Sequence, residues 1–173
     1  MSLLQIVPFE IERHEVLIEP LTELLHRCYR PLAEKGMRYL ATHQPPETTR
    51  ERLQSGDSFL GFWEDRLVAT VTLKKEAPKS LCEWYRRPEI FHFGQFAVDP
   101  ELQGRGLGSS MMNMLESRAL QMGASELALD TSEHADNLIA MYTKRGYRHV
   151  GYAQWEVTNY RSVILSKKLN ADA

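Results

Sequence analysis

The chain has 173 residues, of which 43% are hydrophobic and 25% are charged, and its formal net charge at pH 7 is −2. This length and composition are typical of one globular domain with a buried core, so we take residues 1–173 as a single domain. The 21 Lys and Arg residues are balanced by 23 Asp and Glu residues. A nucleic-acid-binding domain is more often strongly basic, so we expect no nucleic-acid partner.

Neither a metal site nor a membrane segment is indicated. Cys28 and Cys82 lack the close spacing of a zinc or redox motif, so we expect two reduced thiols and no bound metal. Residues 1–5 lack the basic and then apolar pattern of a signal peptide. No stretch approaches the ~18 consecutive apolar residues that would span a bilayer. We therefore expect a cytoplasmic protein with no membrane partner.

The first half of the chain predicts strands and helices in alternation. Residues 5–9 predict a short strand, and Pro8 favours a position at the edge of a sheet. Apolar residues at helical spacing predict a helix over about residues 15–33, which Pro20 and Pro31 are expected to break or bend. A second, short helix is expected over residues 47–53, after a turn that contains Pro45 and Pro46.

Two strand-like runs follow, residues 58–63 and 67–73, and the three residues between them favour an antiparallel hairpin. After a polar stretch, residues 90–98 are apolar at nearly every position, as in a strand covered on both faces. The remaining elements are expected to be helices over about residues 104–122 and 135–145, and strands over residues 126–131, 147–152 and 162–169.

The second half thus predicts a strand–helix–strand unit, whose two strands should be parallel neighbours joined by a right-handed crossover. Because the earlier hairpin is antiparallel, the fold class is α/β, with one mixed β-sheet and helices on both of its faces.

Three glycines lie close together between a buried strand and an amphipathic helix, in the segment Gln103-Gly104-Arg105-Gly106-Leu107-Gly108. The first amides of a helix lack intrahelical acceptors and bind anions, and glycines let a diphosphate approach the backbone closely. Arg105 adds donors for phosphate oxygens. A purely structural turn is the alternative. The spacing excludes a dinucleotide-binding Gly-x-Gly-x-x-Gly turn, and no Gly-Lys-Ser/Thr of a P-loop occurs.

The segment Phe96-Ala97-Val98-Asp99-Pro100-Glu101-Leu102-Gln103-Gly104-Arg105-Gly106-Leu107-Gly108 resembles the most diagnostic motif of the GCN5-related N-acetyltransferase (GNAT) family. That motif is a strand ending in hydrophobic-x-Val-x-Pro, followed by Gln or Arg, two residues, Gly, one residue, and Gly or Ala. A second family element, an Asn in the first turn of the next helix and a Tyr five residues later, matches Asn137 and Tyr142. The first ~90 residues match the family only in the general order of elements.

This resemblance implies an acetyl-CoA-dependent N-acetyltransferase with the acyl-CoA N-acyltransferase fold. In the family, the backbone of the strand, here Phe96, Ala97 and Val98, pairs with the pantetheine arm of acetyl-CoA, and the Asn at position 137 bonds the same arm. The backbone amides that would hold the diphosphate belong to Gln103, Gly104, Arg105, Gly106, Leu107, Gly108 and Ser109. Tyr142 would stand near the sulfur atom.

The reaction needs a proton donor for the leaving thiolate and a proton acceptor for the amine. Tyr142 suits the first role, although its spacing also fits a core aromatic residue. Strand alternation puts His92 on the same face as Phe96 and Val98 and makes it the nearest candidate acceptor. Many members of the family carry a bulge in this strand, and such a bulge would decide whether that face meets the acetyl group. Glu83, Glu89 and a chain of waters are the alternatives.

Substrate contacts are expected from residues 29–43 and 155–160. There, Tyr29, Tyr39, Trp155 and Tyr160 either line the acceptor pocket or are ordinary core residues. The acceptor is expected to be a small-molecule or peptide amine, and a homodimer is left open as the oligomeric state. Two other functions stay open for this sequence: a non-catalytic sensor or scaffold that binds acyl-CoA, and a transferase for another acyl group.

Overall fold

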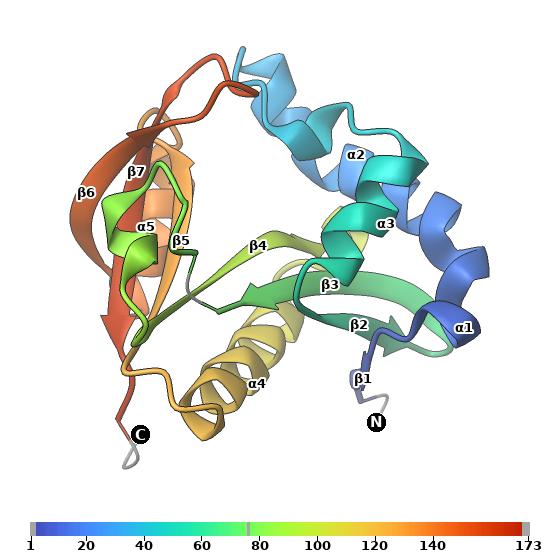
Figure 1. Ribbon diagram of the computed structural model, residues 1–173. Helices are drawn as coiled ribbons and strands as arrows, with labels where there is room; N and C mark the ends of the chain where they lie inside the picture. The colour runs from blue at the N-terminus through green and yellow to red at the C-terminus, as the bar shows by residue number, and fades with distance from the viewer. Residues whose placement is uncertain (1–2, 76, 171–173) are drawn as a thin grey trace.

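The computed structural model describes residues 3–75 and 77–170 and has one seven-stranded sheet with the strand order β1-β2-β3-β4-β5-β7-β6 (Figure 1). The strands are β1 (Gln5–Pro8), β2 (Asp57–Trp63), β3 (Arg66–Lys74), β4 (Ile90–Val98), β5 (Glu126–Ser132), β6 (Arg148–Gln154) and β7 (Arg161–Lys168). Strands β4 and β5 are parallel, and all other neighbours are antiparallel. The sheet is therefore mixed, as the sequence predicts.

Two local predictions for the first strands are confirmed. Strand β1, which carries Pro8, lies at one edge of the sheet, where a missing backbone donor costs little. Strands β2 and β3 form an antiparallel hairpin, and Glu64 and Asp65 in its turn both have positive φ angles of 50° and 61°. Such turns match the right-handed twist of the flanking strands.

The helices divide between the two faces of the sheet. They are α1 (Ile11–His14), α2 (Ile18–Glu34), α3 (Pro46–Gln54), α4 (Leu107–Gln121) and α5 (Asp136–Lys144). Helices α2 and α3 cover one face, where Leu21, Leu25 and Leu53 pack against Leu60 and Ala97.

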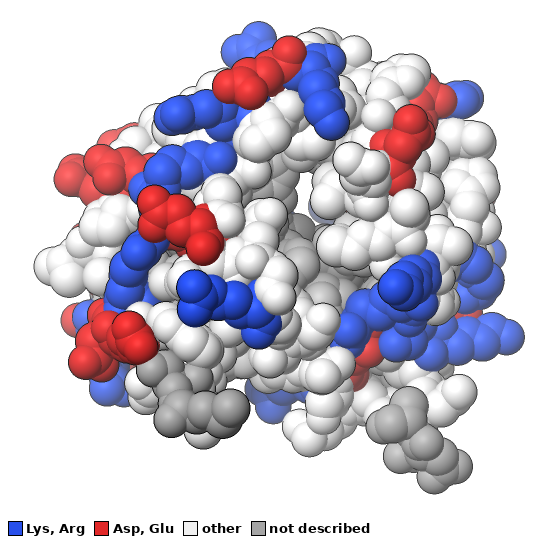
Figure 2. Space-filling view, turned by 180° about the vertical axis from the view of Figure 1, so that it is seen from behind, with Lys and Arg blue, Asp and Glu red and all other residues white. Residues whose placement is uncertain are grey.

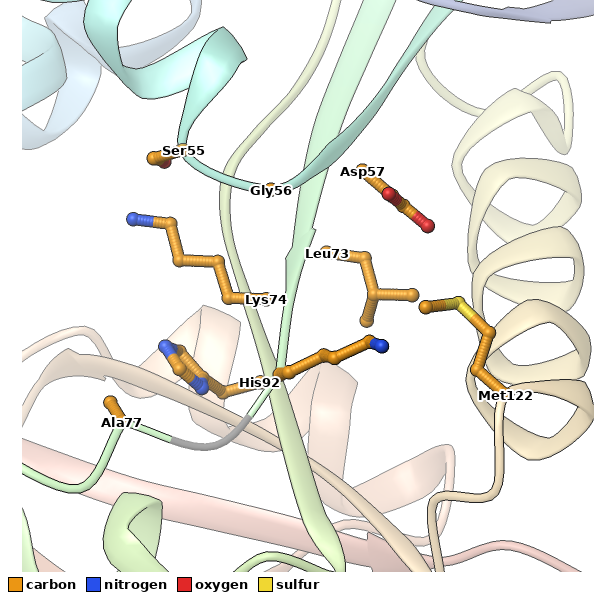
Figure 3. A pocket seen from close by; sticks show the side chains of 9 residues that line it. Ser55, Gly56, Asp57, Leu73, Lys74, Ala77, His92 and Met122 are labelled. Carbon is orange, nitrogen blue, oxygen red and sulfur yellow. The ribbon is translucent and has the colours of Figure 1, made fainter.

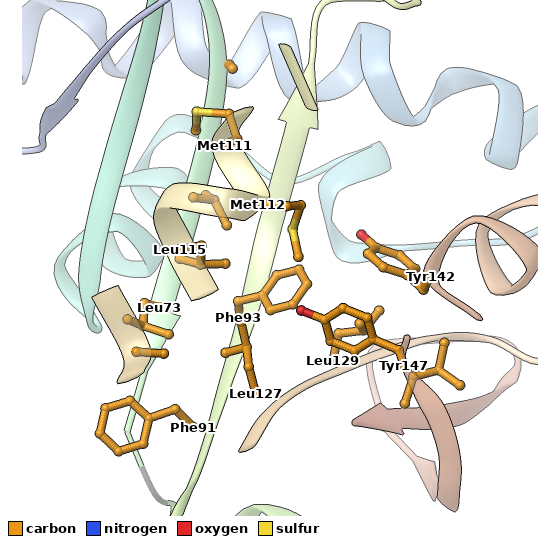
Figure 4. Close-up of a cluster of buried hydrophobic side chains, with 14 of the residues drawn as sticks. Leu73, Phe91, Phe93, Met111, Met112, Leu115, Leu127, Leu129, Tyr142 and Tyr147 are labelled. Carbon is orange, nitrogen blue, oxygen red and sulfur yellow. The ribbon is translucent and has the colours of Figure 1, made fainter. Parts of the chain in front are cut away.

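Helices α4 and α5 cover the other face with the larger core (Figure 4). There, Met111 and Leu115 of α4 and Tyr142 of α5 pack against Phe91 and Phe93 of β4. The predicted arrangement of helices on both faces is thus confirmed.

Two prolines lie in α2 without breaking it, so of the predicted break or bend the break is wrong. Pro20 lies in the first turn, where backbone amides have no intrahelical acceptor and a proline is tolerated. Pro31 lies inside the helix but only one turn before its end at Glu34. The buried apolar side of α2, in which Leu24 is 1% exposed, keeps the helix packed on the sheet.

Candidate active site

Strands β4 and β5 pair over only three residues each and then separate. Ile90–His92 pairs with Glu126–Ala128, whereas the rest of β4 pairs only with β3 and the rest of β5 pairs only with β7. Figure 1 shows the two strands diverging toward the helices α2 and α3. The backbone edge of residues 93–98 is thus left open toward the interior of the molecule, between the two halves of the sheet. Figure 2 shows a hollow near the middle of the opposite view, bordered mostly by uncharged residues.

The glycine turn lies at the end of β4 and leads into α4. Gly104 and Gly106 have φ angles of 79° and 82°, a left-handed conformation that favours glycine. Helix α4 therefore begins at Leu107 and not near Gly104 as predicted, because these glycines stand outside the helix. A Cβ atom at Gly104 or Gly106 would meet no other atom within 4 Å, so the space in front of the turn is open.

The backbone amides of residues 104–109 donate to no acceptor in the part of the chain that the structure describes. The first closing bond of α4 runs from the Ser110 amide to the Gly106 carbonyl, at 3.0 Å. Residues 103–106 are exposed as well. An anion can therefore reach a row of free amides at the positive end of a 15-residue helix.

Asp99 anchors the start of this turn. Its carboxylate is 1% exposed, accepts 2.6 Å and 3.4 Å contacts from Arg66 and Arg27, and accepts a hydrogen bond from the Glu101 amide. Burial alone would raise the pKa of this carboxyl, but the Glu101 amide and Arg66 together hold the pKa below its usual value. Asp99 thus stays ionised and fixes the turn at the end of β4.

Helix α2 ties down the end of β4 near the same turn. The Tyr29 hydroxyl donates a 2.9 Å hydrogen bond to the Phe96 carbonyl, and the Cys28 thiol contacts the Val98 carbonyl at 3.3 Å. The Gln103 side chain also reaches the Val98 carbonyl, at 3.4 Å. The Phe96 carbonyl keeps a second lone pair, so a ligand can still bond this edge of the strand there.

A bulge in β4 reverses the side-chain alternation that the sequence suggests. Gln95 has a φ angle of 51°, and the register between β3 and β4 shifts there, from Thr72↔Gly94 to Thr70↔Ala97. Because one residue is inserted, Phe93 and Phe96 lie on the same face of the strand, in edge contact at 6.2 Å.

His92 therefore does not share a face with Phe96 and Val98, and that prediction is wrong. Phe96 and Val98 pack against the core under α4, whereas His92 stacks on Tyr85, which belongs to a separate cluster. His92 instead lies on the face that α2 and α3 cover, the same face as Ala97.

The surroundings of His92 keep its ring neutral. The ring stacks on Tyr85 with centroids 4.1 Å apart and planes 11° apart, and its buried Nδ1 has no hydrogen-bond partner among the described residues. Burial, and then the charge of Lys74, lower the pKa of His92 to about 4. A neutral imidazole with a free nitrogen can accept a proton.

Tyr142 lies on the opposite side of the opening, on α5. The residue is 6% exposed, and its ring contacts Phe93 and Tyr147 with centroids 6.1 Å and 5.6 Å apart. Its hydroxyl forms no hydrogen bond with another described residue. Burial raises the pKa of Tyr142 well above its usual range, so the hydroxyl keeps its proton. Asn137 is exposed in the first turn of the same helix.

The four aromatic residues named from the sequence fall into two groups. Tyr29, Tyr39 and Tyr160 contact one another as tilted rings, with successive centroids 5.4 Å and 4.9 Å apart, and the Tyr39 and Thr131 hydroxyls share a 2.7 Å hydrogen bond. Trp155 lies instead beside Tyr85, 6.4 Å between centroids. Both groups flank the opening where β5 leaves β4.

Three charged residues of this region are absent from the sequence-based candidates. Asp130 of β5 accepts hydrogen bonds from the Tyr85 hydroxyl at 3.0 Å and the Trp155 indole at 2.9 Å. Arg52 of α3 and Lys74 of β3 lie partly buried near it. Asp130 could have been found from the sequence, because it is an acid in the otherwise uncharged run that follows Glu126 in β5. Arg52 and Lys74 carry no comparable signal.

A pocket of about 470 Å³ opens where β3 ends and β4 begins (Figure 3). Its lining includes Ser55, Gly56, Leu73, Lys74, His92 and Met122. Glu83 and Glu89, the alternative proton acceptors, are both exposed and line no part of this pocket. Of the sequence-based candidates for the proton acceptor, His92 is thus the one that the structure puts at a cavity.

Within residues 3–75 and 77–170, no group of three or more His, Cys, Asp or Glu side chains could hold a metal ion. The helices of that same part of the chain are all too short or too polar to cross a membrane.

Two curated proteins of Bacillus subtilis (strain 168) are similar to this chain. One, named S-(2-succino)cysteine N-acetyltransferase, is 28% identical over 159 residues, which is 89% of this chain and 92% of that protein. The other, named S-alkylcysteine N-acetyltransferase, is 25% identical over 134 residues, which is 73% of this chain and 71% of that protein.

Solved structures share the fold at low sequence identity. A protein of Pyrococcus horikoshii OT3 has a TM-score of 0.74 at 16% identity, with 97% of this chain and 99% of that chain covered. A GNAT family acetyltransferase from Elizabethkingia anophelis with acetyl-CoA bound has a TM-score of 0.62 at 15% identity, with 96% and 98% covered.

The model of the acetyltransferase (GNAT) family matches residues 18–147, which is more than half of the chain and includes both β4 and the glycine turn. This chain therefore belongs to the GNAT family and is an acetyl-CoA-dependent N-acetyltransferase, which transfers an acetyl group to an amine.

Proposed function

We propose that the acceptor is the amino group of a small S-substituted cysteine, and that the whole chain forms one domain for this reaction. The observation that carries this proposal is the similarity to two N-acetyltransferases that are both named for S-substituted cysteines, one of them over 92% of its length. The acceptor side of the opening fits a small molecule, because aromatic side chains flank it at Tyr39 and Trp155.

For the co-substrate, we propose that the amides of residues 103–109 hold the diphosphate of acetyl-CoA. The free amides of residues 104–109 and the open space at Gly106 support this assignment. Arg105 is exposed beside them and can add its own donors. The open edge of β4 at Phe96–Val98 would pair with the pantetheine arm, and the exposed Asn137 would bond the same arm from α5.

Acetyl-CoA supplies the thioester that the amine attacks, and the thiolate that leaves needs a proton. We assign the donor role to Tyr142, because its hydroxyl is free of internal hydrogen bonds and keeps its proton at neutral pH. Its neighbour Tyr147 does not fit this role, since the Tyr147 hydroxyl already donates to Glu116 at 3.0 Å.

The amine must lose a proton, and we assign its acceptance to His92. A pKa near 4 keeps the imidazole neutral, and its buried Nδ1 lacks a partner among the described side chains. His92 and Tyr142 lie on opposite faces of β4, so the amine and the leaving thiolate would be served from opposite sides of the thioester.

The proposal is tested by incubating the protein with acetyl-CoA and a panel of amines, with thiol release and product mass as readouts. The panel contains S-methyl-L-cysteine, S-(2-succino)cysteine, a lysine-containing peptide and an aminoglycoside. We expect N-acetylation of the two cysteine derivatives with kcat/KM in the usual enzyme range above about 10⁴ M⁻¹s⁻¹ for the better one. Efficient acetylation of only the peptide or the aminoglycoside would contradict the proposal.

A further inference from the structure

Arg52 reaches the backbone of β4 from the helix that covers it. Its Nη1 atom donates a 2.6 Å hydrogen bond to the Gln44 side-chain oxygen. Its Nη2 atom lies 3.7 Å from the position that a Cβ atom on Gly94 would occupy. Because Gly94 has no side chain, the guanidinium lies directly over the strand, one residue before the bulge at Gln95.

A buried hydrogen-bond network fixes the guanidinium in this place. Gln44 is 0% exposed, and its side-chain amide donates to Thr49 at 2.7 Å and to the Gln95 side chain at 3.0 Å. Thr49 in turn accepts a 2.7 Å hydrogen bond from Thr22 of α2. One edge of the guanidinium is used by Gln44, and its other donors remain available.

The charge of Arg52 has no carboxylate partner within 4 Å among residues 3–75 and 77–170. Other arginines of the chain do have one: Arg145 pairs with Glu116 at 2.8 Å, and Arg148 with Glu126 at 2.9 Å. Burial lowers the pKa of Arg52, which reflects the cost of removing this charge from water. A partly buried, unpaired cation in a fixed position suits an anionic ligand group.

Lys74 adds a second cation on the same face. It lies directly across from His92 in the register of β3 and β4, and Figure 3 shows both side chains on the same side of the strands. Burial, and then the charge of Arg52, lower the pKa of Lys74. None of the described carboxylates forms an ion pair with it.

The carboxyl group of Asp130 also lies on this face, and burial raises its pKa above the usual value. His92 is level with Ala128 in β5, and Asp130 lies two residues further along, so all three share one face of the sheet. Both oxygens of Asp130 accept hydrogen bonds from aromatic side chains, Tyr85 and Trp155. The face thus offers two cationic groups and a separate carboxyl group to one ligand.

We infer that Arg52, assisted by Lys74, binds the carboxylate of an amino-acid acceptor and so selects amino acids over simple amines. The amino group of the same acceptor would lie on the side of Asp130 and His92. This inference rests on the proposed function and adds the residues that recognise the acceptor. The alternative is that Arg52 only orients Gln44 and the bulge of β4.

The test compares two acceptors that differ only in the carboxylate, S-methyl-L-cysteine and 2-(methylthio)ethylamine. The proteins are the parent, Arg52→Gln, Arg52→Lys, and Arg50→Gln as a matched control. Arg50 lies on the same helix but pairs with Glu15 at 2.6 Å, on the surface. For each protein, kcat and KM are measured with both acceptors, together with acetyl-CoA affinity and melting temperature.

We expect the parent to prefer S-methyl-L-cysteine, and Arg52→Gln to lose about 10–100-fold in kcat/KM for it, mainly through KM. The same variant should leave kcat/KM for 2-(methylthio)ethylamine unchanged, Arg52→Lys should be intermediate, and Arg50→Gln should match the parent. An equal loss with both acceptors, no loss with either, or a parent without preference for the carboxylate would overturn the inference. If Arg52→Gln does not fold, the same comparison with Arg52→Lys decides.

Failure of the proposed function gives a different result. In that case the parent acetylates neither thioether, although it binds acetyl-CoA, and the assigned acceptor class is wrong together with the inference that rests on it. If the parent acetylates S-methyl-L-cysteine but the Arg52 variants change kcat/KM equally for both compounds, the proposed function stands and only the role of Arg52 is wrong.

Discussion

Phe93 and Phe96 contact each other on one face of β4, although the two residues between them would put them on opposite faces of a regular strand. The left-handed conformation of Gln95 between them inserts one residue and reverses the alternation. Phe96 thereby joins Phe93 on the face of α4 and α5, where Phe93 contacts Tyr142, whereas His92 faces the helices on the other side. The proposed proton donor and the proposed proton acceptor thus lie on opposite faces of β4.

The first prediction concerns the diphosphate site. Gly106→Glu places a carboxylate where the free amides face open space, so we expect it to abolish acetyl-CoA binding in calorimetry. Gly106→Asn is the control, because asparagine tolerates the left-handed φ of 82° and adds no charge. The backbone strain of either variant is about 1–2 kcal/mol. If Gly106→Glu binds acetyl-CoA as tightly as Gly106→Asn does, the diphosphate does not bind at this turn.

The second prediction concerns the leaving group. Tyr142→Phe removes a hydroxyl that makes no internal hydrogen bond, so the free energy of unfolding should change little. Loss of a general acid should lower kcat about 10²–10⁴-fold. Tyr147→Phe is a matched control in the same core. It breaks a hydrogen bond to Glu116, so it should destabilise the fold by about 1.5–3 kcal/mol and leave kcat nearly unchanged.

For Tyr142→Phe, chemical denaturation and steady-state kinetics are measured together. If kcat stays at the parent value while chemistry limits the rate, Tyr142 has only a packing role.

The third prediction concerns the pH dependence of kcat/KM. A catalytic histidine with its ordinary pKa would make kcat/KM rise with pH around pH 6.5, which is one limb of the pH profile. Burial, however, lowers the pKa of His92 to about 4. His92 is then already in its basic form throughout the neutral range, so the limb that it causes should lie near pH 4. Any rise above pH 6 should come from the amine of the acceptor itself.

His92→Gln should lower kcat/KM at every pH from 6 to 9 and keep the shape of the profile. A parent limb near pH 6.5 that disappears in His92→Gln would show that the pKa is not lowered in the working enzyme. Superimposable curves for the two proteins would make His92 a structural residue.

The fourth prediction links the same histidine to stability. The unfolded chain binds a proton at His92 below about pH 6.5, whereas the folded chain binds it only below a pKa of about 4. Its contribution to stability is therefore fully present above pH 6.5 and is lost as the pH falls toward 4. The melting temperature of His92→Gln should fall less than that of the parent over this window. Parallel curves would contradict the lowered pKa.

The local parts of the site could be predicted from the sequence. The bounds of β4 at Ile90 and Val98 are as expected, because a continuous apolar run between Pro88 and Pro100 allows little else. The glycine turn was placed correctly between strand and helix. Helix α4 begins later than the sequence predicts, because Gly104 and Gly106 have positive φ angles and so lie outside the helix. The spacing of apolar residues does not reveal such angles.

Features that depend on tertiary structure could not be predicted. The face of His92 depends on one inserted residue at Gln95, a residue type with no special preference for a bulge. Arg52 and Lys74 come together only because α3 folds over β3 and β4, and neither stands out in its own segment. Of these three charged residues, Asp130 alone carries a signal in the sequence, as an acid within a buried strand.

The most direct test of the whole account is a crystal structure of the protein with CoA and N-acetyl-S-methyl-L-cysteine bound together. We expect the pantetheine arm in the opening between β4 and β5, and the CoA sulfur within about 3.5 Å of the Tyr142 hydroxyl. The acetylated nitrogen should face His92, and the carboxylate should contact Arg52. A sulfur atom remote from Tyr142, or an acceptor bound outside the face that carries His92, Arg52 and Asp130, would contradict the account.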